Sequence, residues 1–173
     1  DSHVHRLLVS LTSRFSLWHA AGLLADAAFP TLDASSLVAV YSPKAHGAYC
    51  WHTAASTKVM DAVALFSSVV ALLGGNGQAN YAAANACLDA LSSFRRAHGS
   101  ASVSVQWGAW AEIGMATRGA AGERTAAKEA AAGFVRIGLA QGLEALGSAV
   151  QPGSPSVLSM VLVSWSRLLS TEV

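Results

Sequence analysis

The sequence has few charges and few cysteines, and both shortages exclude classes of protein. Only 12% of its 173 residues are charged, 11 basic against 10 acidic, and neither sign forms a run. Binding to nucleic acid requires a clustered basic surface, so we expect no nucleic-acid partner. Cys50 and Cys87 form no C-x-x-C pair. Their spacing predicts neither a disulfide framework nor a metal site, and favours a reducing, cytoplasmic setting.

Long hydrophobic runs are missing as well, although 53% of the residues are hydrophobic. The longest run, 62–73, is interrupted by Ser67 and Ser68 and closed by two glycines. A membrane span needs about 20 mostly apolar residues, so we expect no membrane association. The chain begins without Met or a signal-peptide pattern, which suggests an excerpt from a longer polypeptide. The hydrophobic content predicts a folded core.

Short β-type runs alternate with longer Ala-rich stretches along the chain. We expect strands at 15–18, 62–67, 102–107 and 156–163, and helices at 33–56, 79–98, 123–132 and 141–149. Asp33 is the expected N-cap of the first helix, and Pro43 interrupts that helix near its middle. This alternation predicts an α/β fold: a doubly wound parallel sheet with helices on both faces.

The residues best suited to catalysis or ligand binding lie between Phe66 and Asp89. A strand ends in Ser67 and Ser68, a glycine-containing loop follows, and Tyr81 lies near the start of the next helix with Asn85 four residues later. Ligands of open parallel sheets bind at the carboxyl ends of strands, and side chains at i and i+4 share one helix face. Taken alone, the serines could simply satisfy backbone groups and the tyrosine could be a packing residue.

A phenol with an ordinary pKa of about 10 needs a nearby cation to act in acid–base chemistry at neutral pH. The chain has three lysines, Lys44, Lys58 and Lys128. Lys58 enters the serine-bearing strand at its amino end, which is the wrong end. Lys44 follows Pro43 in the preceding helix, so Lys44 is the favoured partner of Tyr81.

Several ordered segments resemble the ketoreductase (KR) domain of modular polyketide synthases, within the short-chain dehydrogenase/reductase superfamily. They are HAAG (19–22), SPKAHGAY (42–49), LFSS (65–68), GQANYAAANACLDAL (77–91), VQWGAWAEIGMA (105–116) and VSWSRLL (163–169), and the likeness covers about 15–170. The resemblance implies NADPH-dependent reduction of a β-ketoacyl thioester carried on an acyl carrier protein. The other domains of a synthase polypeptide are then further partners.

The resemblance also implies roles for individual residues. Ser68 matches the serine that binds the substrate carbonyl, Tyr81 the proton donor, and Lys44 with Asn85 the lysine and asparagine of the proton relay. The implied cofactor-binding residues are His19, Ala20, Gly22, Lys44, Tyr81, Trp107 and Gly108, with His19 in a mainly structural role. Asp26, Leu73 and Met115 are the implied substrate and stereocontrol positions.

Two positions bear on product stereochemistry. The subtype that yields D-configured alcohols carries Leu-Asp-Asp after HAAG, and this chain has Leu24-Ala25-Asp26, which keeps the last Asp. The opposite subtype carries Trp eight residues before the tyrosine, where this chain has Leu73. We therefore expect the D-configured product.

One expected element is missing from the sequence. No G-x-G-x-x-G turn between a strand and a helix occurs in the chain. We therefore interpret 1–173 as a single partial ketoreductase domain with a partial Rossmann-like fold, lacking the N-terminal nucleotide-phosphate-binding half and inactive in isolation. The alternatives are a non-catalytic remnant or partner-binding fragment of a megasynthase, or another short-chain dehydrogenase acting on a free small molecule.

Overall fold

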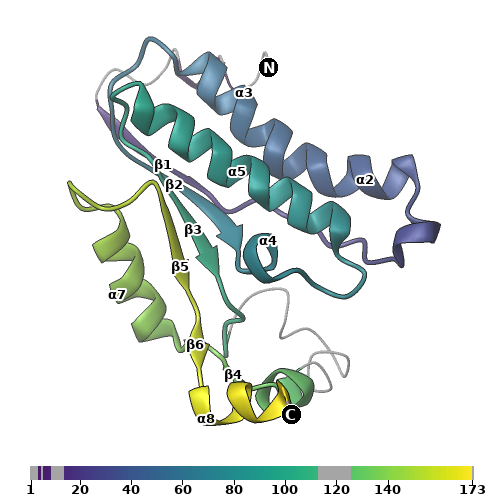
Figure 1. Ribbon diagram of the computed structural model, residues 1–173. Helices are drawn as coiled ribbons and strands as arrows, with labels where there is room; N and C mark the ends of the chain where they lie inside the picture. Colours follow the sequence, from purple (N-terminus) through teal and green to yellow (C-terminus); the bar gives the residue numbers. More distant parts are fainter. Residues whose placement is uncertain (1–3, 5, 9–13, 113–125, 173) are drawn as a thin grey trace.

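A four-stranded parallel sheet forms the centre of the molecule. The computed structural model describes residues 4, 6–8, 14–112 and 126–172. The strands are β1 (Phe15–His19), β2 (Met60–Ser68), β3 (Val103–Trp107) and β5 (Val157–Met160), in the order β1-β2-β3-β5 (Figure 1). All three pairings are parallel, which confirms the predicted sheet.

Helices cover both faces of this sheet, as the sequence pattern predicts. α5 (Ala79–Ala97) lies over β2 and β3 together with α2 (Ala34–Tyr41) and α3 (Gly47–Ala54), and α7 (Leu139–Ala149) lies on the opposite face (Figure 1). Alternate residues of β2 pack into two hydrophobic clusters, one on each face of the sheet. Val63 and Leu65 pack with Leu88 of α5, whereas Ala64 packs with Val105 in the cluster on the α7 side.

The helix predicted at 33–56 exists, but its middle is a wider π-helical turn. Asp33 caps α2, since its side chain accepts a hydrogen bond from the Ser36 amide at 2.8 Å. A π-helix over Ser42–His46 then separates α2 from α3. Pro43 lies at its start and has no N–H to donate, so the regular ladder is broken there. The turn directs Lys44 into the protein.

The C-terminal part differs from the sequence-based expectation. The single strand expected at 156–163 is divided into β5 and β6 (Leu162–Val163), and β6 pairs antiparallel with β4 (Phe134–Val135) in a separate two-stranded sheet. Residues 126–131 of the expected 123–132 helix are helical. Met115 and residues 123–125 lie outside the described residues. The remaining short elements are α4 (Val70–Leu73), α8 (Trp165–Leu168) and 3₁₀ turns at Phe29–Thr31 and Leu169–Glu172.

Two glycines of α7 provide a matched test of the core on that face. A Cβ at the buried Gly142 would overlap the Trp110 ring, whereas a Cβ at the exposed Gly147 would meet nothing within 4 Å. We expect Gly142→Ala to lower the free energy of unfolding by about 1–3 kcal/mol. Gly147→Ala should raise it by about 0.5–1 kcal/mol through lost unfolded-chain entropy. Urea unfolding of the complete domain measures both, and equal effects would contradict this packing.

Candidate active site

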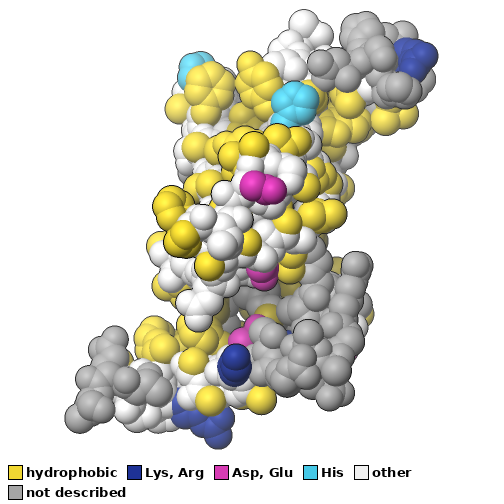
Figure 2. Space-filling model, turned by 90° about the vertical axis from the view of Figure 1, so that its right-hand side faces the viewer, with side chains coloured by type: hydrophobic (Ala, Val, Ile, Leu, Met, Phe, Trp, Pro, Cys, Tyr) yellow, Lys and Arg dark blue, Asp and Glu magenta, His cyan; other side chains and the backbone are white. Residues whose placement is uncertain are grey.

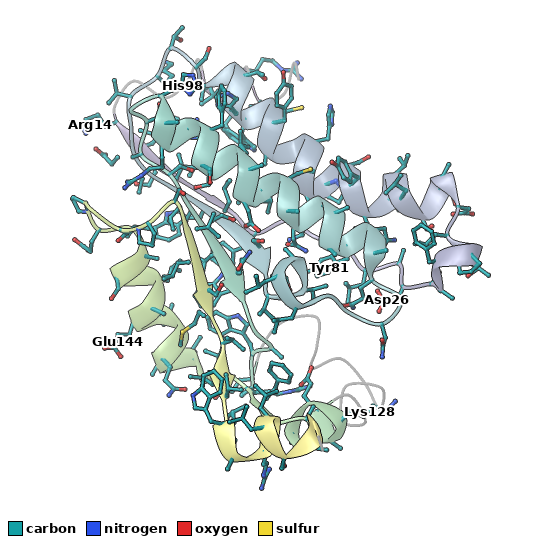
Figure 3. All side chains as sticks on the ribbon, in the orientation of Figure 1. Arg14, Asp26, Tyr81, His98, Lys128 and Glu144 are labelled. Carbon is teal, nitrogen blue, oxygen red and sulfur yellow. The ribbon has the colours of Figure 1, made fainter. Side chains whose placement is uncertain are left out.

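Three elements bring four of the predicted residues together at the carboxyl end of β2. Ser68 ends β2, Tyr81 and Asn85 lie in the first two turns of α5, and Lys44 comes from the π-helical turn. All four are buried, with exposures of 7%, 8%, 0% and 3%. Figure 3 shows Tyr81 on the N-terminal part of α5, close to α4 and to the segment that carries Asp26. The convergence expected from the sequence is therefore present.

Lys44 lies directly beside the Tyr81 ring. Its Nζ is 5.2 Å from the ring centroid and donates a hydrogen bond of 2.8 Å to the Phe66 carbonyl of β2. Lys58 precedes the amino end of β2, at the other end of the sheet. The choice of Lys44 as the partner of Tyr81 thus agrees with the geometry.

Burial changes the pKa of both Lys44 and Tyr81. Loss of solvent lowers the pKa of Lys44 to about 8, and the Asp89 carboxylate opposes part of that decrease. Burial also raises the pKa of Tyr81, an effect that Asp26 adds to and that hydrogen bonding from Asn85 and Ser68 partly offsets. At neutral pH the site therefore holds a neutral phenol beside an ammonium group.

Asn85 is tied to the site through its backbone and one side-chain atom. Its Nδ2 donates to the Tyr81 carbonyl at 2.8 Å, and Ser67 Oγ donates to the Asn85 carbonyl at 3.3 Å. The fully buried Asn85 Oδ1 has no hydrogen-bond partner among the residues that the structure describes. A buried acceptor of this kind requires a donor from a water or a ligand.

His19 supports the π-helical turn. Its Nε2 lies 2.8 Å from the Lys44 carbonyl, and because a carbonyl only accepts, Nε2 carries the proton. Burial lowers the pKa of His19, which keeps the imidazole neutral. A Cβ at Gly47 would lie 3.3 Å from the His19 ring, so the helix passes close to it. His19 thereby links the end of β1 to the π-helical turn.

The other implied cofactor residues occupy two strand ends. Ala20 and Gly22 are exposed in the segment that follows β1. Trp107 ends β3, but its side chain is only 5% exposed and packs in the core against Phe66 and Trp110. Gly108 follows, with its amide bonded to the Met160 carbonyl. The Trp107 carbonyl accepts a hydrogen bond of 2.9 Å from the Val69 amide, so the end of β3 is joined to the segment that follows β2.

The segment carrying Asp26 is docked on the loop before α5. Asn80 Nδ2 donates to the Ala25 carbonyl at 2.9 Å, and Gln78 Nε2 donates to Asp26 Oδ2 at 3.1 Å. Gly77, with a φ of +72°, approaches the Ala27 backbone and accepts a hydrogen bond from its amide. Leu73 lies in α4 and is 57% exposed. Met115 lies outside the described residues, so its implied position has no structural counterpart here.

One polar network near these residues was not predicted from the sequence. Asp89, eight residues after Tyr81 on α5, accepts hydrogen bonds from Ser104 and Gln106 of β3. The spacing of Tyr81, Asn85 and Asp89, at i, i+4 and i+8, places Asp89 on the same helix face, but it does not indicate which strand residues bond to it.

The part of the chain that the structure describes contains no group of three His, Cys, Asp or Glu side chains able to hold a metal ion. In the same residues, no helix is both long and apolar enough to cross a bilayer.

Comparison with known proteins supplies the family. The family model of the KR domain matches residues 3–112. The chain is 41% identical over 149 residues to polyketide synthase GfsB of Streptomyces halstedii, covering 86% of this chain and 3% of that protein. It is 41% identical over 97 residues to a phthioceranic/hydroxyphthioceranic acid synthase of Mycobacterium tuberculosis, covering 56% of this chain and 5% of the synthase.

Solved structures agree with this match. The first ketoreductase of the tylosin polyketide synthase superimposes with a TM-score of 0.86 at 34% identity, and A-type ketoreductases from a modular polyketide synthase with 0.88 at 31%. Both comparisons cover 98% of this chain and 36% of the solved chain. The fold is that of the ketoreductase-type oxidoreductases. The chain belongs to the KR domain family of modular polyketide synthases.

Proposed function

We propose that this chain provides the catalytic centre for NADPH-dependent reduction of a β-ketoacyl thioester, carried on an acyl carrier protein, to the β-hydroxyacyl thioester. The observation that carries the proposal is the buried Lys44 ammonium 5.2 Å from the Tyr81 ring centroid, at the carboxyl end of β2. Membership of the KR family supports the reaction class.

Each residue of the site has a chemical task in this proposal. Tyr81 donates its proton to the carbonyl oxygen as negative charge develops there. Ser68 Oγ accepts a hydrogen bond from the Val70 amide, which leaves its own O–H to polarise the same oxygen. The Lys44 ammonium stabilises the phenolate that Tyr81 becomes. The free acceptor Asn85 Oδ1 fits a relay that returns a proton to the phenol.

The nicotinamide half of NADPH fits the residues present. When bound, the dinucleotide supplies the hydride that reaches the carbonyl carbon. Lys44 and Tyr81 would hold its ribose, and the exposed backbone at 20–22 and the end of β3 flank the same edge of the sheet. The sequence contains no glycine-rich phosphate turn. Residues outside this chain would have to bind the pyrophosphate, so we expect the isolated chain to show no turnover.

Apolar side chains near the site suit an acyl substrate. Exposed leucines lie on α4 and on the segment after β1: Leu72, Leu73, Leu23 and Leu24. Figure 2 shows hydrophobic side chains over much of this side of the molecule, with few charged groups among them. An acyl chain next to the ketone would lie against such side chains at little desolvation cost.

The test uses the full polypeptide that carries this chain. With NADPH and a model β-ketoacyl thioester, we expect oxidation of NADPH in step with formation of the β-hydroxy thioester. Chiral chromatography should identify the D-configured alcohol, because Asp26 is retained and position 73 is not Trp. An L-configured product would refute the stereochemical assignment. No reduction by a folded full polypeptide would favour the non-catalytic alternative.

A further inference from the structure

Asp89 is a half-buried carboxylate that the proposed mechanism does not use. Ser104 Oγ donates to its Oδ1 at 2.6 Å, and Gln106 Nε2 donates to its Oδ2 at 2.8 Å. Ser159 of β5 donates in turn to Gln106 Oε1 at 2.5 Å. Ser104 and Gln106 are themselves buried, at 0% and 8% exposure. Three elements, α5, β3 and β5, therefore hold this carboxylate in one position.

The sheet register places this carboxylate beside the site of Lys44. Lys44 Nζ donates to the carbonyl of Phe66, and Phe66 of β2 pairs with Val105 of β3. Val105 is the residue between Ser104 and Gln106, the two donors to Asp89. Neighbouring strands lie about 4.8 Å apart. The ammonium over β2 and the carboxylate over β3 are thus close neighbours, although they form no direct ion pair.

Other titratable groups also surround Lys44. From β1, His19 bonds to the Lys44 carbonyl; from α5, Tyr81 lies beside the ammonium; and His46 belongs to the same π-helical turn. None of these side chains is a carboxylate. Burial lowers the pKa of Lys44, and Asp89 is the acidic side chain that raises it.

We propose that Asp89 is a positioning residue for the ketone reduction: its carboxylate, held over β3 by Ser104 and Gln106, keeps the Lys44 ammonium charged at neutral pH. The inference rests on the proposed function, because it assumes that a charged Lys44 is needed beside Tyr81. The Asp89 carboxylate attracts the Lys44 ammonium across the spacing between β2 and β3, and the low dielectric of the interior strengthens this attraction.

Replacement of the carboxylate by an amide tests the charge with little change of shape. In the full polypeptide, Asp89→Asn should move the alkaline limit of ketoreduction downward by about one pH unit. Activity at pH 8 should then fall about 5-fold, with a change of less than about 2-fold at pH 6. Rotation of the Gln106 amide and the Ser159 hydroxyl lets the new amide keep its hydrogen bonds, so a merely structural role would not move the pH profile.

Two variants serve as controls. Asp61→Asn removes the same charge from a half-exposed carboxylate paired with Arg14 at the amino end of β2, and should leave the pH profile unchanged. The double variant Asp89→Asn/Gln106→Glu moves the negative charge onto β3 within the same network. It should restore the alkaline limit toward that of the parent protein.

A direct titration separates this inference from the proposed function. The ¹³Cε signal of Lys44, assigned by comparison with Lys44→Met, should titrate about one pH unit lower in Asp89→Asn. Failure of the parent protein to reduce a ketone would count against the proposed function alone. An unchanged Lys44 titration in a folded Asp89→Asn protein would overturn the inference. If Asp89→Asn does not fold, Asp89→Leu/Gln106→Leu removes charge and partner together, and the same readouts apply.

Discussion

Tyr81→Phe is expected to lower kcat for ketoreduction by about 10²–10⁴-fold, the usual contribution of general acid catalysis. The substitution removes only the hydroxyl, and the ring remains in the cluster that it shares with Val40, Ala45 and Ala84. Proton transfer to the developing alkoxide would then depend on water, which this buried site restricts. The measurement is NADPH oxidation by the full polypeptide with a saturating model thioester.

The chain offers a matched control for this substitution. Tyr49 lies on α3 and is 58% exposed, so Tyr49→Phe removes the same atom from a tyrosine outside the cluster. Its kcat should match that of the parent protein. A folded Tyr81→Phe protein with undiminished turnover would show that another group supplies the proton.

Lys44→Met is expected to cause the second large effect, a loss of activity combined with a gain in stability. Without the ammonium, the phenolate of Tyr81 has no neighbouring positive charge, so we expect kcat to fall by at least about 10²-fold. The apolar side chain also removes a buried charge. If Lys44 served only to hold the fold together, its replacement would instead lower the stability of the protein.

The stability effect has a defined dependence on pH. The pKa of Lys44 is about 8 in the folded protein against an ordinary value of 10.5, so the unfolded chain binds the proton more tightly. The cost of the buried charge is fully present below pH 8 and is relieved as pH rises toward 10.5. Lys44→Met should therefore be more stable at pH 7, by up to roughly 3 kcal/mol less the lost bond to the Phe66 carbonyl.

Chemical unfolding at pH 7 and pH 9.5 checks this expectation. The stability advantage of Lys44→Met should shrink at the higher pH. Lys128→Met replaces an exposed lysine and should change neither activity nor stability. A stability difference that stays constant between the two pH values would mean that Lys44 is not the group whose proton is lost.

Much of this site could be predicted because its residues are close in the sequence. Ser68 and Tyr81 belong to one strand–loop–helix unit, and the i, i+4 spacing of Tyr81 and Asn85 places both on one helix face whatever the remainder of the chain does. Lys44 could be selected because only three lysines exist and the ends of β2 distinguish them. The order of strands and helices followed from hydrophobic periodicity in the same way.

Other features depended on contacts between distant segments. The network of Asp89 joins α5 to β3 and β5, and no local pattern indicates which helix residue faces which strand residue. The division of the last strand at Val161 follows from the pairing of β6 with β4. The core position of the Trp107 ring follows from the face of β3 that α7 covers.

The sequence by itself determined the class of fold and the strand end at which the candidate site residues gather, because periodicity, caps and short spacings are local properties. Only the tertiary structure decided how those side chains are charged. Burial shifts the pKa of Lys44 and of Tyr81, and Asp89 over β3 acts on Lys44 over the neighbouring strand β2. Desolvation and Coulomb interactions act through space, so they exist only once the sheet and its helices have been assembled.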